Sequence, residues 1–356
     1  MRGSDMGVNL SGLTEPVPID IPDLSGKKIA IDSYNVIYQF LSSIRQPDGQ
    51  PLCDSQGRTT SHLTGLLHRT ASLVEAGIEP VFVFDGKPHP LKSRTLQERT
   101  ERRDRAEEEY REALERGDEE TARTKAQQTS RMTKEVRETS RELIRYLGFP
   151  IVDAPSDGEQ QAALMCRRGD VYAAASQDFD SLLFGTPLLV RNLTLTGRRK
   201  VPGRQLYREI KTEMIDSSVF LHTLGISREQ LVDMCILMGT DFNPGIKGIG
   251  PKKALKLIRS EGDLKSALRK IGGEIPEADE VRGIFLDEGG DQNYSLAQGQ
   301  ADRDKVMDML TSYEFSEQRV TSALDRIDKA RKEAARRSRQ TSLDGWFRWP
   351  RISIFI

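Results

Sequence analysis

The sequence is poor in the residues that bind soft metals or form cross-links. Its 356 residues include three cysteines and four histidines. The cysteines, Cys53, Cys166 and Cys235, lie far apart, and none has CxxC spacing. This spacing excludes a structural zinc site and a disulfide framework, and the free thiols suit a reducing compartment.

The sequence also lacks a charge imbalance and long apolar runs. Its formal net charge is −1, so binding to a polyanion would depend on local clusters of cations. There is no run of 18 apolar residues and no signal peptide, which predicts an intracellular protein without membrane contact. Residues Met1–Asp5 resemble a vector leader before a natural start at Met6, and we expect them to lie outside the fold.

Four short apolar runs are each followed within a few residues by carboxylates. The runs are residues 27–31, 80–84, 149–152 and 171–175, and their composition predicts buried β-strands. Helical patterns between them predict an α/β fold, a mainly parallel twisted sheet flanked by helices. Residues 188–192 and 199–201 are predicted to form a hairpin around Thr196 and Gly197. The acids that follow the four runs are Asp32, Asp85, Asp157, Glu159, Asp178 and Asp180.

The segment 171–185 shows most clearly why these acids matter. Asp178 and Asp180 stand at the carboxyl end of a predicted strand, where ligands bind in parallel α/β sheets. A solvated turn with an aspartate helix cap would explain one such pair. Four acid-bearing strand ends at one edge are better explained by bound cations, because like charges held together repel each other.

The donor set indicates which cations these would be. Carboxylates without nearby histidine or cysteine favour hard ions, Mg²⁺ or Mn²⁺. Six or seven carboxylates are more than one ion needs. We therefore predict two ions, which in two-metal sites lie roughly 3.5–4 Å apart and hydrolyse a phosphodiester. The sequence shows no Ser-His-Asp or Cys-His pattern for a protein nucleophile.

A highly charged segment, residues 92–141, separates the second and third predicted strands. It has few large apolar residues, which predicts long solvated helices, and Gly117–Asp118 would divide them into a pair. An inert charged hairpin would have the same composition. However, cations gather at its start, close in sequence to Asp85, which suits a phosphate beside the acidic edge. These cations are Lys92, Arg94, Arg99, Arg102, Arg103 and Arg105.

A glycine-rich segment follows at residues 237–254. Its glycine spacing is that of a helix–hairpin–helix turn, in which a tight backbone exposes N–H groups to a DNA phosphate. Lysines follow the turn, and such elements hold duplex backbone without reading sequence. A tight turn between core helices is the alternative. The glycines are Gly245, Gly248 and Gly250, the lysines are Lys252 and Lys253, and Asp241 just before them would be a seventh acid.

The C-terminal segment combines a basic stretch with a short apolar motif. Residues 325–339 carry an excess of Lys and Arg and predict a partly helical linker. Residues 340–347, QTSLDGWF, resemble the box that binds a sliding clamp (PCNA). A short 3₁₀ turn would place three apolar side chains on one side, where they could fill a pocket of the partner. The box residues are Gln340, Leu343, Trp346 and Phe347.

Together these motifs resemble one enzyme family. They are IAIDSYNVIYQFL (29–41), TTSH (59–62), VFVFDGKPHPLK (81–92), APSDGEQQAA (154–163), SQDFDSLLFG (176–185) and MGTDFNPGIKGIGPKKA (238–254). In this order they are similar to flap endonucleases of the archaeal and eukaryotic type, in the structure-specific 5′ nuclease family. The resemblance implies a PIN-like or resolvase-like nuclease core over residues 6–330. A helical arch at about 90–140, a helix–hairpin–helix element at about 228–275 and a clamp-binding tail at 331–356 would complete it.

The resemblance also implies an activity. Such an enzyme is a 5′ flap endonuclease and 5′–3′ exonuclease that cuts one phosphodiester near the junction of single- and double-stranded DNA. It would act in Okazaki-fragment maturation and base excision repair. Its expected cofactors are two Mg²⁺ ions, with Mn²⁺ as substitute, and a K⁺ ion at the helix–hairpin–helix element. Branched DNA and the sliding clamp would be its partners, and it would work as a monomer in archaeal cytoplasm or a eukaryotic nucleus.

By the same resemblance, family functions fall on particular residues of this chain. The seven acids match the family's metal ligands. Lys92 and Arg99 match cations that approach the scissile phosphate, and Tyr38 matches an aromatic that stacks near the reacting nucleotide. Thr60 falls where the family holds a one-nucleotide 3′ flap, and Gly7 matches an N-terminus near the DNA. Further DNA contacts would come from Arg102 and Arg103 and from the glycine turn with its lysines.

One departure and two alternatives accompany this prediction. The family usually has Glu where this chain has Asp157, so the shorter side chain would reach a metal ion through water. A nuclease of the same superfamily that acts on bubbles or recombination intermediates is one alternative. A catalytically silent scaffold that binds DNA junctions is the other, and the complete acid set argues against it.

Overall fold

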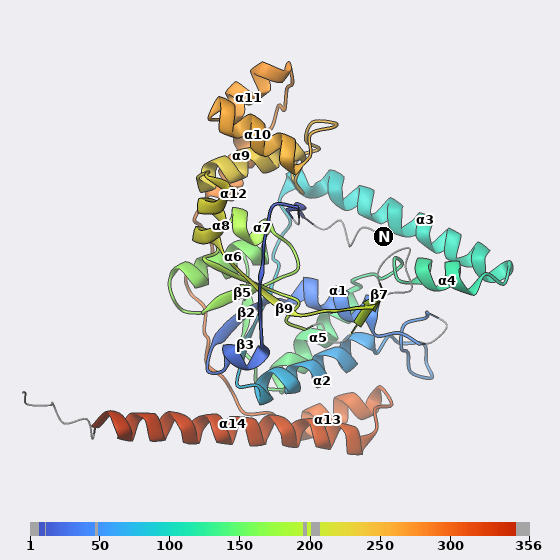
Figure 1. Cartoon of the computed structure of the whole chain (residues 1–356). Helices are drawn as coiled ribbons and strands as arrows, with labels where there is room; N and C mark the ends of the chain where they lie inside the picture. Colours follow the sequence, from blue (N-terminus) through green and yellow to red (C-terminus); the bar gives the residue numbers. More distant parts are fainter. Residues whose placement is uncertain (1–6, 11, 47–48, 195–197, 201–206, 347–356) are drawn as a thin grey trace, which may run out of the picture.

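A mixed sheet forms the centre of the computed structural model (Figure 1). Its seven strands follow the order β1-β9-β6-β5-β2-β3-β4. The structure describes residues 7–346, apart from 11, 47–48, 195–197 and 201–206. The strands are β1 (Val17–Ile19), β2 (Lys28–Asp32), β3 (Glu79–Phe84), β4 (Ile151–Asp153), β5 (Ala173–Ala175), β6 (Leu188–Arg191) and β9 (Thr212–Asp216). From β6 to β4 all neighbours are parallel, while β9 runs antiparallel to β6 and to β1.

Alternate side chains along the central strands face opposite sides of the sheet and belong to two different hydrophobic cores. In β2, Ile29 and Ile31 belong to the core under α1 (Ser33–Ser43) and α2 (Ser61–Glu75), whereas Ala30 belongs to the core under α6 (Gly158–Arg167). β3 alternates in the same way. Both faces of the sheet are therefore covered by helices, which is why these strands are continuous apolar runs. The α/β fold and the four parallel strands are confirmed.

The predicted hairpin at residues 188–201 is wrong. Residues 188–191 form β6, which pairs with β5 and β9, whereas β7 (Arg198–Lys200) pairs with β8 (Tyr207–Glu209) in a separate sheet. Leu189 and Val190 are completely buried. Such a strand is stabilised more by lying within the main sheet than by pairing in an exposed hairpin. Thr196 and Gly197 lie outside the described residues.

The charged segment between β3 and β4 projects away from the sheet (Figure 1). It contains the short η2 (Pro90–Lys92), α3 (Ser93–Glu115) and α4 (Glu119–Ala126), and the expected break lies at Gly117 and Asp118. Gly117 has a φ of +70°, and the Asp118 carboxylate accepts a hydrogen bond from the Thr121 N–H to cap α4. The next helix, α5 (Lys134–Tyr146), returns to the main core.

A second group of helices packs at the opposite end of the molecule from α14 (Figure 1). Its members are α7 (Asp180–Leu183), α8 (Ser217–Leu224), α9 (Arg228–Met238), α10 (Pro251–Glu261), α11 (Leu264–Ile271) and α12 (Ala278–Leu286). The remaining elements are η1 (Ile21–Leu24), α13 (Arg303–Ser312) and α14 (Glu317–Trp346). Among the described residues, no helix has both the length and the apolar character needed to cross a membrane.

The backbone of the clamp-binding motif differs from the expected short 3₁₀ turn. Residues 340–346 continue α14 as an α-helix, and Phe347 lies outside the described residues. The preceding residues, 326–339, are rich in Ala, Lys and Arg, which are strong helix formers, so the helix extends into the motif.

Candidate active site

The carboxyl ends of the parallel strands bring the predicted acids to one edge of the sheet. Six of these acids lie at the end of a parallel strand or near the start of the helix that follows it, so the fold itself places them together. The seventh, Asp241, comes from the segment after a helix, and its charge acts on Asp180. Asp32 ends β2, Asp85 follows β3, Asp157 precedes α6, Glu159 lies in its first turn, Asp178 follows β5, Asp180 begins α7 and Asp241 follows α9. We call these seven residues the acidic cluster.

Hydrogen bonds through two neutral side chains join three members of the cluster. Ser176 Oγ lies 3.2 Å from Asp32 Oδ2 and 3.4 Å from Glu159 Oε1. Asn35 Nδ2 donates to Asp178 Oδ2 at 3.0 Å, and the Asn35 N–H donates to Asp32 Oδ1 at 3.0 Å. The second contact caps α1. Asp32 is therefore a helix cap as well as a neighbour of other acids.

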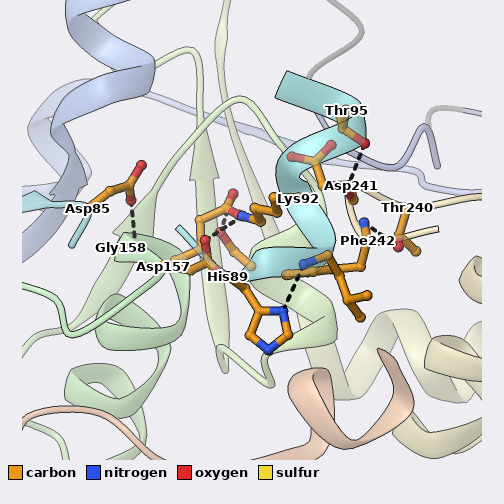
Figure 2. Close-up of polar contacts among 12 residues, drawn as sticks. Asp85, His89, Lys92, Thr95, Asp157, Gly158, Thr240, Asp241 and Phe242 are labelled. Carbon is orange, nitrogen blue, oxygen red and sulfur yellow. Dashed lines mark hydrogen bonds and ion pairs between the residues drawn. The ribbon is translucent and has the colours of Figure 1, made fainter. Parts of the chain in front are cut away.

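Backbone N–H groups hold two further acids. The Gly158 N–H donates to Asp85 Oδ1 at 2.7 Å (Figure 2). The N–H of Val8 donates to Asp180 Oδ1 at 2.7 Å, although the two residues are 172 positions apart. Gly7 has a φ of +75°, and a Cβ there would lie 2.8 Å from the same oxygen. The backbone near the N-terminus thus packs directly against the cluster, and only glycine fits at position 7.

Burial and mutual repulsion raise the pKa of five cluster carboxyls. Burial is the largest cause at each, and the charge of another acid adds to it at every group except Asp32. For Asp180, burial and the charge of Asp241 raise the pKa to about 7. Asp85 keeps an exposed side, but the surrounding protein and Asp32 still raise its pKa. The five groups are Asp32, Asp85, Glu159, Asp178 and Asp180. Ionising them together costs free energy that a bound cation would offset.

Two cations near the start of α3 reach two acids of the cluster, and Figure 2 shows one of them, Lys92, beside Asp157. Lys92 forms an ion pair with Asp157, and its ammonium lies 4.8 Å from the centre of the Phe242 ring. Arg99 Nη2 lies 2.6 Å from Asp241 Oδ1. Burial opposes the charge of Lys92, but the carboxylates of Asp157 and Asp241 outweigh it and raise the Lys92 pKa. Lys92 therefore stays charged, and the base of the projecting helix faces the acids.

The structure brings the predicted Tyr38 and Arg103 together. Arg103 Nη1 donates to Tyr38 Oη at 3.3 Å, and Arg103 lies one helical turn beyond Arg99 in α3. Arg102 is exposed on the same helix. Thr60 is buried just before α2, where its N–H donates to the Leu52 carbonyl at 2.7 Å.

The predicted glycine turn joins α9 to α10. Gly245 has a φ of +68°, and a Cβ there would lie 2.3 Å from the backbone nitrogen of Gly239. Gly248 also has a positive φ, +83°, whereas Gly250 precedes α10 with an ordinary φ of −104°. The lysines that follow, Lys252 and Lys253, are exposed on the first turn of α10. The turn thus requires glycine at 245 and presents two cations beside it.

The cluster fits hard divalent ions by its chemistry. Its donors are all carboxylates, they are crowded on one edge, and their raised pKa values show that their negative charge is poorly compensated. As they stand, no three His, Cys, Asp or Glu side chains in the described part of the chain converge closely enough to hold an ion. Two of the acids, Asp157 and Asp241, are already paired with Lys92 and Arg99.

Comparison with known proteins relates this site to a family. The XPG N-terminal domain matches residues 6–106, and the XPG I-region matches residues 148–241. Flap endonuclease 1 of Aeropyrum pernix is 49% identical over 350 residues, which cover 96% of this chain and 100% of that protein. Flap endonuclease 1 of Pyrococcus furiosus is 48% identical over 345 residues, with 96% and 100% covered. The chain belongs to the flap endonuclease 1 family.

Solved structures agree with this membership of the flap endonuclease 1 family. Flap endonuclease-1 from Methanococcus jannaschii superposes with a TM-score of 0.73 at 39% identity, covering 91% of this chain and 98% of that one. The catalytic core of Rad2 in complex with DNA substrate gives a TM-score of 0.65 at 22% identity, with 88% and 96% covered, and shares the fold.

Sequence reasoning missed the neutral side chains that connect the acids. Asn35 and Ser176 belong to motifs that carried the family resemblance, but neither is an acid or a base, so they were not selected. The spacing of Asn35, three residues after Asp32, is that of a helix cap and could have drawn attention to it. Thr95 Oγ1, which donates to the Asp241 carbonyl at 2.7 Å, left no sequence signal (Figure 2).

Proposed function

We propose that this chain cuts 5′-flap DNA by two-metal hydrolysis at the acidic cluster. As a member of the flap endonuclease 1 family it is a structure-specific nuclease, a hydrolase of phosphodiester bonds. The cut would fall near the junction of single- and double-stranded DNA, with 5′–3′ exonuclease activity as well. The observation that carries the proposal is the placement of seven carboxylates at one sheet edge, with Lys92 and Arg99 facing them.

The acidic cluster would hold two Mg²⁺ ions, and Mn²⁺ would substitute for them. When bound, such ions activate water and stabilise the leaving oxygen. Lys92 and Arg99 would then have a second role. When DNA binds, they would leave their ion pairs with Asp157 and Asp241 and contact the scissile phosphate, which is also negatively charged. Tyr38, which accepts a hydrogen bond from Arg103, would stack on the base next to that phosphate.

Duplex DNA would lie against the turn between α9 and α10. Gly248 and Gly250 are exposed with open space where a Cβ would lie, so a DNA backbone could approach the main chain there, and Lys252 and Lys253 supply charge. This would be the place for a K⁺ ion. Arg102 and Arg103 would contact the 5′ strand, Thr60 would adjoin a 3′ flap, and Gly7 would lie near the DNA beside Asp180.

The end of α14 would connect the enzyme to a sliding clamp. Gln340, Leu343, Trp346 and Phe347 would enter the partner's pocket after the helix rearranges into a shorter turn. The enzyme would act as an intracellular monomer, in the replication and repair roles of its family.

Cleavage of a labelled double-flap DNA tests the proposal. We expect one main product at the junction with Mg²⁺, none with EDTA, and little cutting of single strands or bubbles. Asp180→Ala should abolish cleavage and leave flap binding. Asp153→Asn is the matched control, because Asp153 also ends a strand at this edge but is paired with Arg141 at 2.5 Å. Binding without any cleavage by the wild-type chain would instead support a silent scaffold.

A further inference from the structure

Arg191, the last residue of β6, contacts both neighbours of Asp178 in the chain. Its Nε donates to the Gln177 carbonyl at 3.2 Å, and its guanidinium carbon lies 4.2 Å from the centre of the Phe179 ring. Its Nη1 lies 3.7 Å from Glu213 Oε2 on β9, which fixes the far side of the guanidinium. One half-buried side chain therefore holds the residues on each side of a cluster acid.

The other contacts of this turn come from the opposite side. Asn35 Nδ2 donates to Asp178 Oδ2 at 3.0 Å, and Asn35 Oδ1 accepts from the Gln177 N–H at 3.3 Å. Ser176 Oγ accepts from the Asp178 N–H at 3.1 Å. These contacts hold the Asp178 carboxylate and the N–H groups of Gln177 and Asp178. Phe179 is also held by the core in which its ring is buried, and Arg191 adds the side-chain hydrogen bond to the Gln177 carbonyl.

We infer that Arg191 is a positioning residue that aims the Asp178 carboxylate into the acidic cluster for divalent-ion binding, an inference that rests on the proposed function. A planar guanidinium can bond a carbonyl with its Nε and stack on a ring at the same time. A lysine ammonium cannot do both. Groups that orient a metal ligand typically change metal affinity or activity 10- to 100-fold when they are removed.

Position and charge have opposite expected effects here, which makes the inference testable. A cation beside a divalent ion repels it, so loss of the charge alone would strengthen metal binding. Loss of the contacts that orient the Asp178 carboxylate would weaken metal binding. Arg191→Lys keeps the charge and loses these contacts, and Arg191→Gln loses both the charge and the contacts.

Arg228 provides a matched control. Its Nε donates to the Leu183 carbonyl at 3.0 Å, and its Nη2 donates to the Phe285 carbonyl at 2.8 Å. It is a half-buried arginine that holds the same chain segment a few residues later, at the last residue of α7 rather than before this helix. Arg228→Gln should therefore cost similar stability while leaving Asp178 in place.

The primary experiment measures Mn²⁺ binding to the DNA-free full chain by calorimetry, for wild type, Arg191→Lys, Arg191→Gln and Arg228→Gln. We expect both Arg191 variants to bind Mn²⁺ about 10- to 100-fold more weakly and Arg228→Gln to stay within about twofold of wild type. Wild-type affinity in Arg191→Lys, tighter binding in Arg191→Gln, or an equal loss in Arg228→Gln would overturn the inference. Arg191→Lys keeps the size and charge of the side chain, so it serves if Arg191→Gln does not fold.

A single-turnover assay on flap DNA separates this inference from the proposed function. In the Arg191 variants we expect the rate at saturating DNA to fall, the DNA affinity to be unchanged, and the rate to recover partly at high Mn²⁺. If wild-type protein binds Mn²⁺ but never cuts flaps, the proposed function is wrong, while the comparison of Mn²⁺ affinities between wild type and the Arg191 variants still tests the inference. Wild-type cutting with unchanged rates in both Arg191 variants would contradict the inference alone.

Discussion

Because the carboxylates of the acidic cluster repel one another when ionised, the stability of the metal-free protein should fall as the pH rises. Asp180 is 4% exposed, and burial together with the charge of Asp241 raises its pKa to about 7 from the ordinary 3.8. A carboxyl whose pKa is raised by folding binds its proton more tightly in the folded state. Metal-free protein should therefore lose stability as the pH rises from about 4 to about 7.

The size of this effect follows from the two pKa values. Each pH unit well between them contributes about 1.4 kcal/mol, and less as the folded-state pKa is approached. Asp180 therefore accounts for a loss of about 2 kcal/mol between pH 5 and pH 7. Asp180→Asn removes the ionisable group, and its Oδ1 can still accept the hydrogen bond from Val8. In EDTA the variant should gain about 2 kcal/mol over wild type across this range.

Urea unfolding at pH 5, 6 and 7 measures the difference. Saturating Mg²⁺ should restore wild-type stability at pH 7 and have little effect on Asp180→Asn, because the ion replaces the proton as partner of the carboxylate. Asp153→Asn is the control. Arg141 lowers the pKa of Asp153, so the stability that this acid contributes is lost only below the ordinary value, and its effect should be constant from pH 5 to 7. A constant difference between wild type and Asp180→Asn would refute the reasoning.

Three further predictions concern the residues around the cluster. Lys92→Met should slow single-turnover cleavage about 10²-fold or more and have a smaller effect on flap affinity. The reason is that the substitution removes a charge directed at the scissile phosphate. Equal losses in cleavage rate and flap affinity would contradict that role. Gly245→Ala should lower the free energy of unfolding by about 1–3 kcal/mol and weaken duplex binding, because its Cβ would lie 2.3 Å from the Gly239 nitrogen. Gly250→Ala, with open space and an ordinary φ, should stay close to wild type in urea unfolding. Asp157→Glu should keep flap cleavage and shift the Mg²⁺ or Mn²⁺ optimum, and a loss of cleavage would contradict this.

The sequence was sufficient to predict the sheet edge because its signals are local. An apolar run followed by an acid marks a strand end at Asp32 or Asp178 without knowledge of the partners, and parallel topology then brings those ends together. Long-range choices left no such signal. Whether β6 pairs within a hairpin or inside the main sheet depends on β9, and Arg191 contacts Gln177 only because that pairing was made. The helical extension of α14 depends on residues outside the motif itself.

The central claim is that the acidic cluster holds two divalent ions. Anomalous diffraction from a crystal soaked in Mn²⁺ tests it most directly, because it locates each ion without assuming its ligands. We predict two peaks roughly 4 Å apart, bounded by Asp85 on one side and Asp178 on the other. Peaks elsewhere on the molecule, or none at a concentration that supports cleavage, would contradict the account.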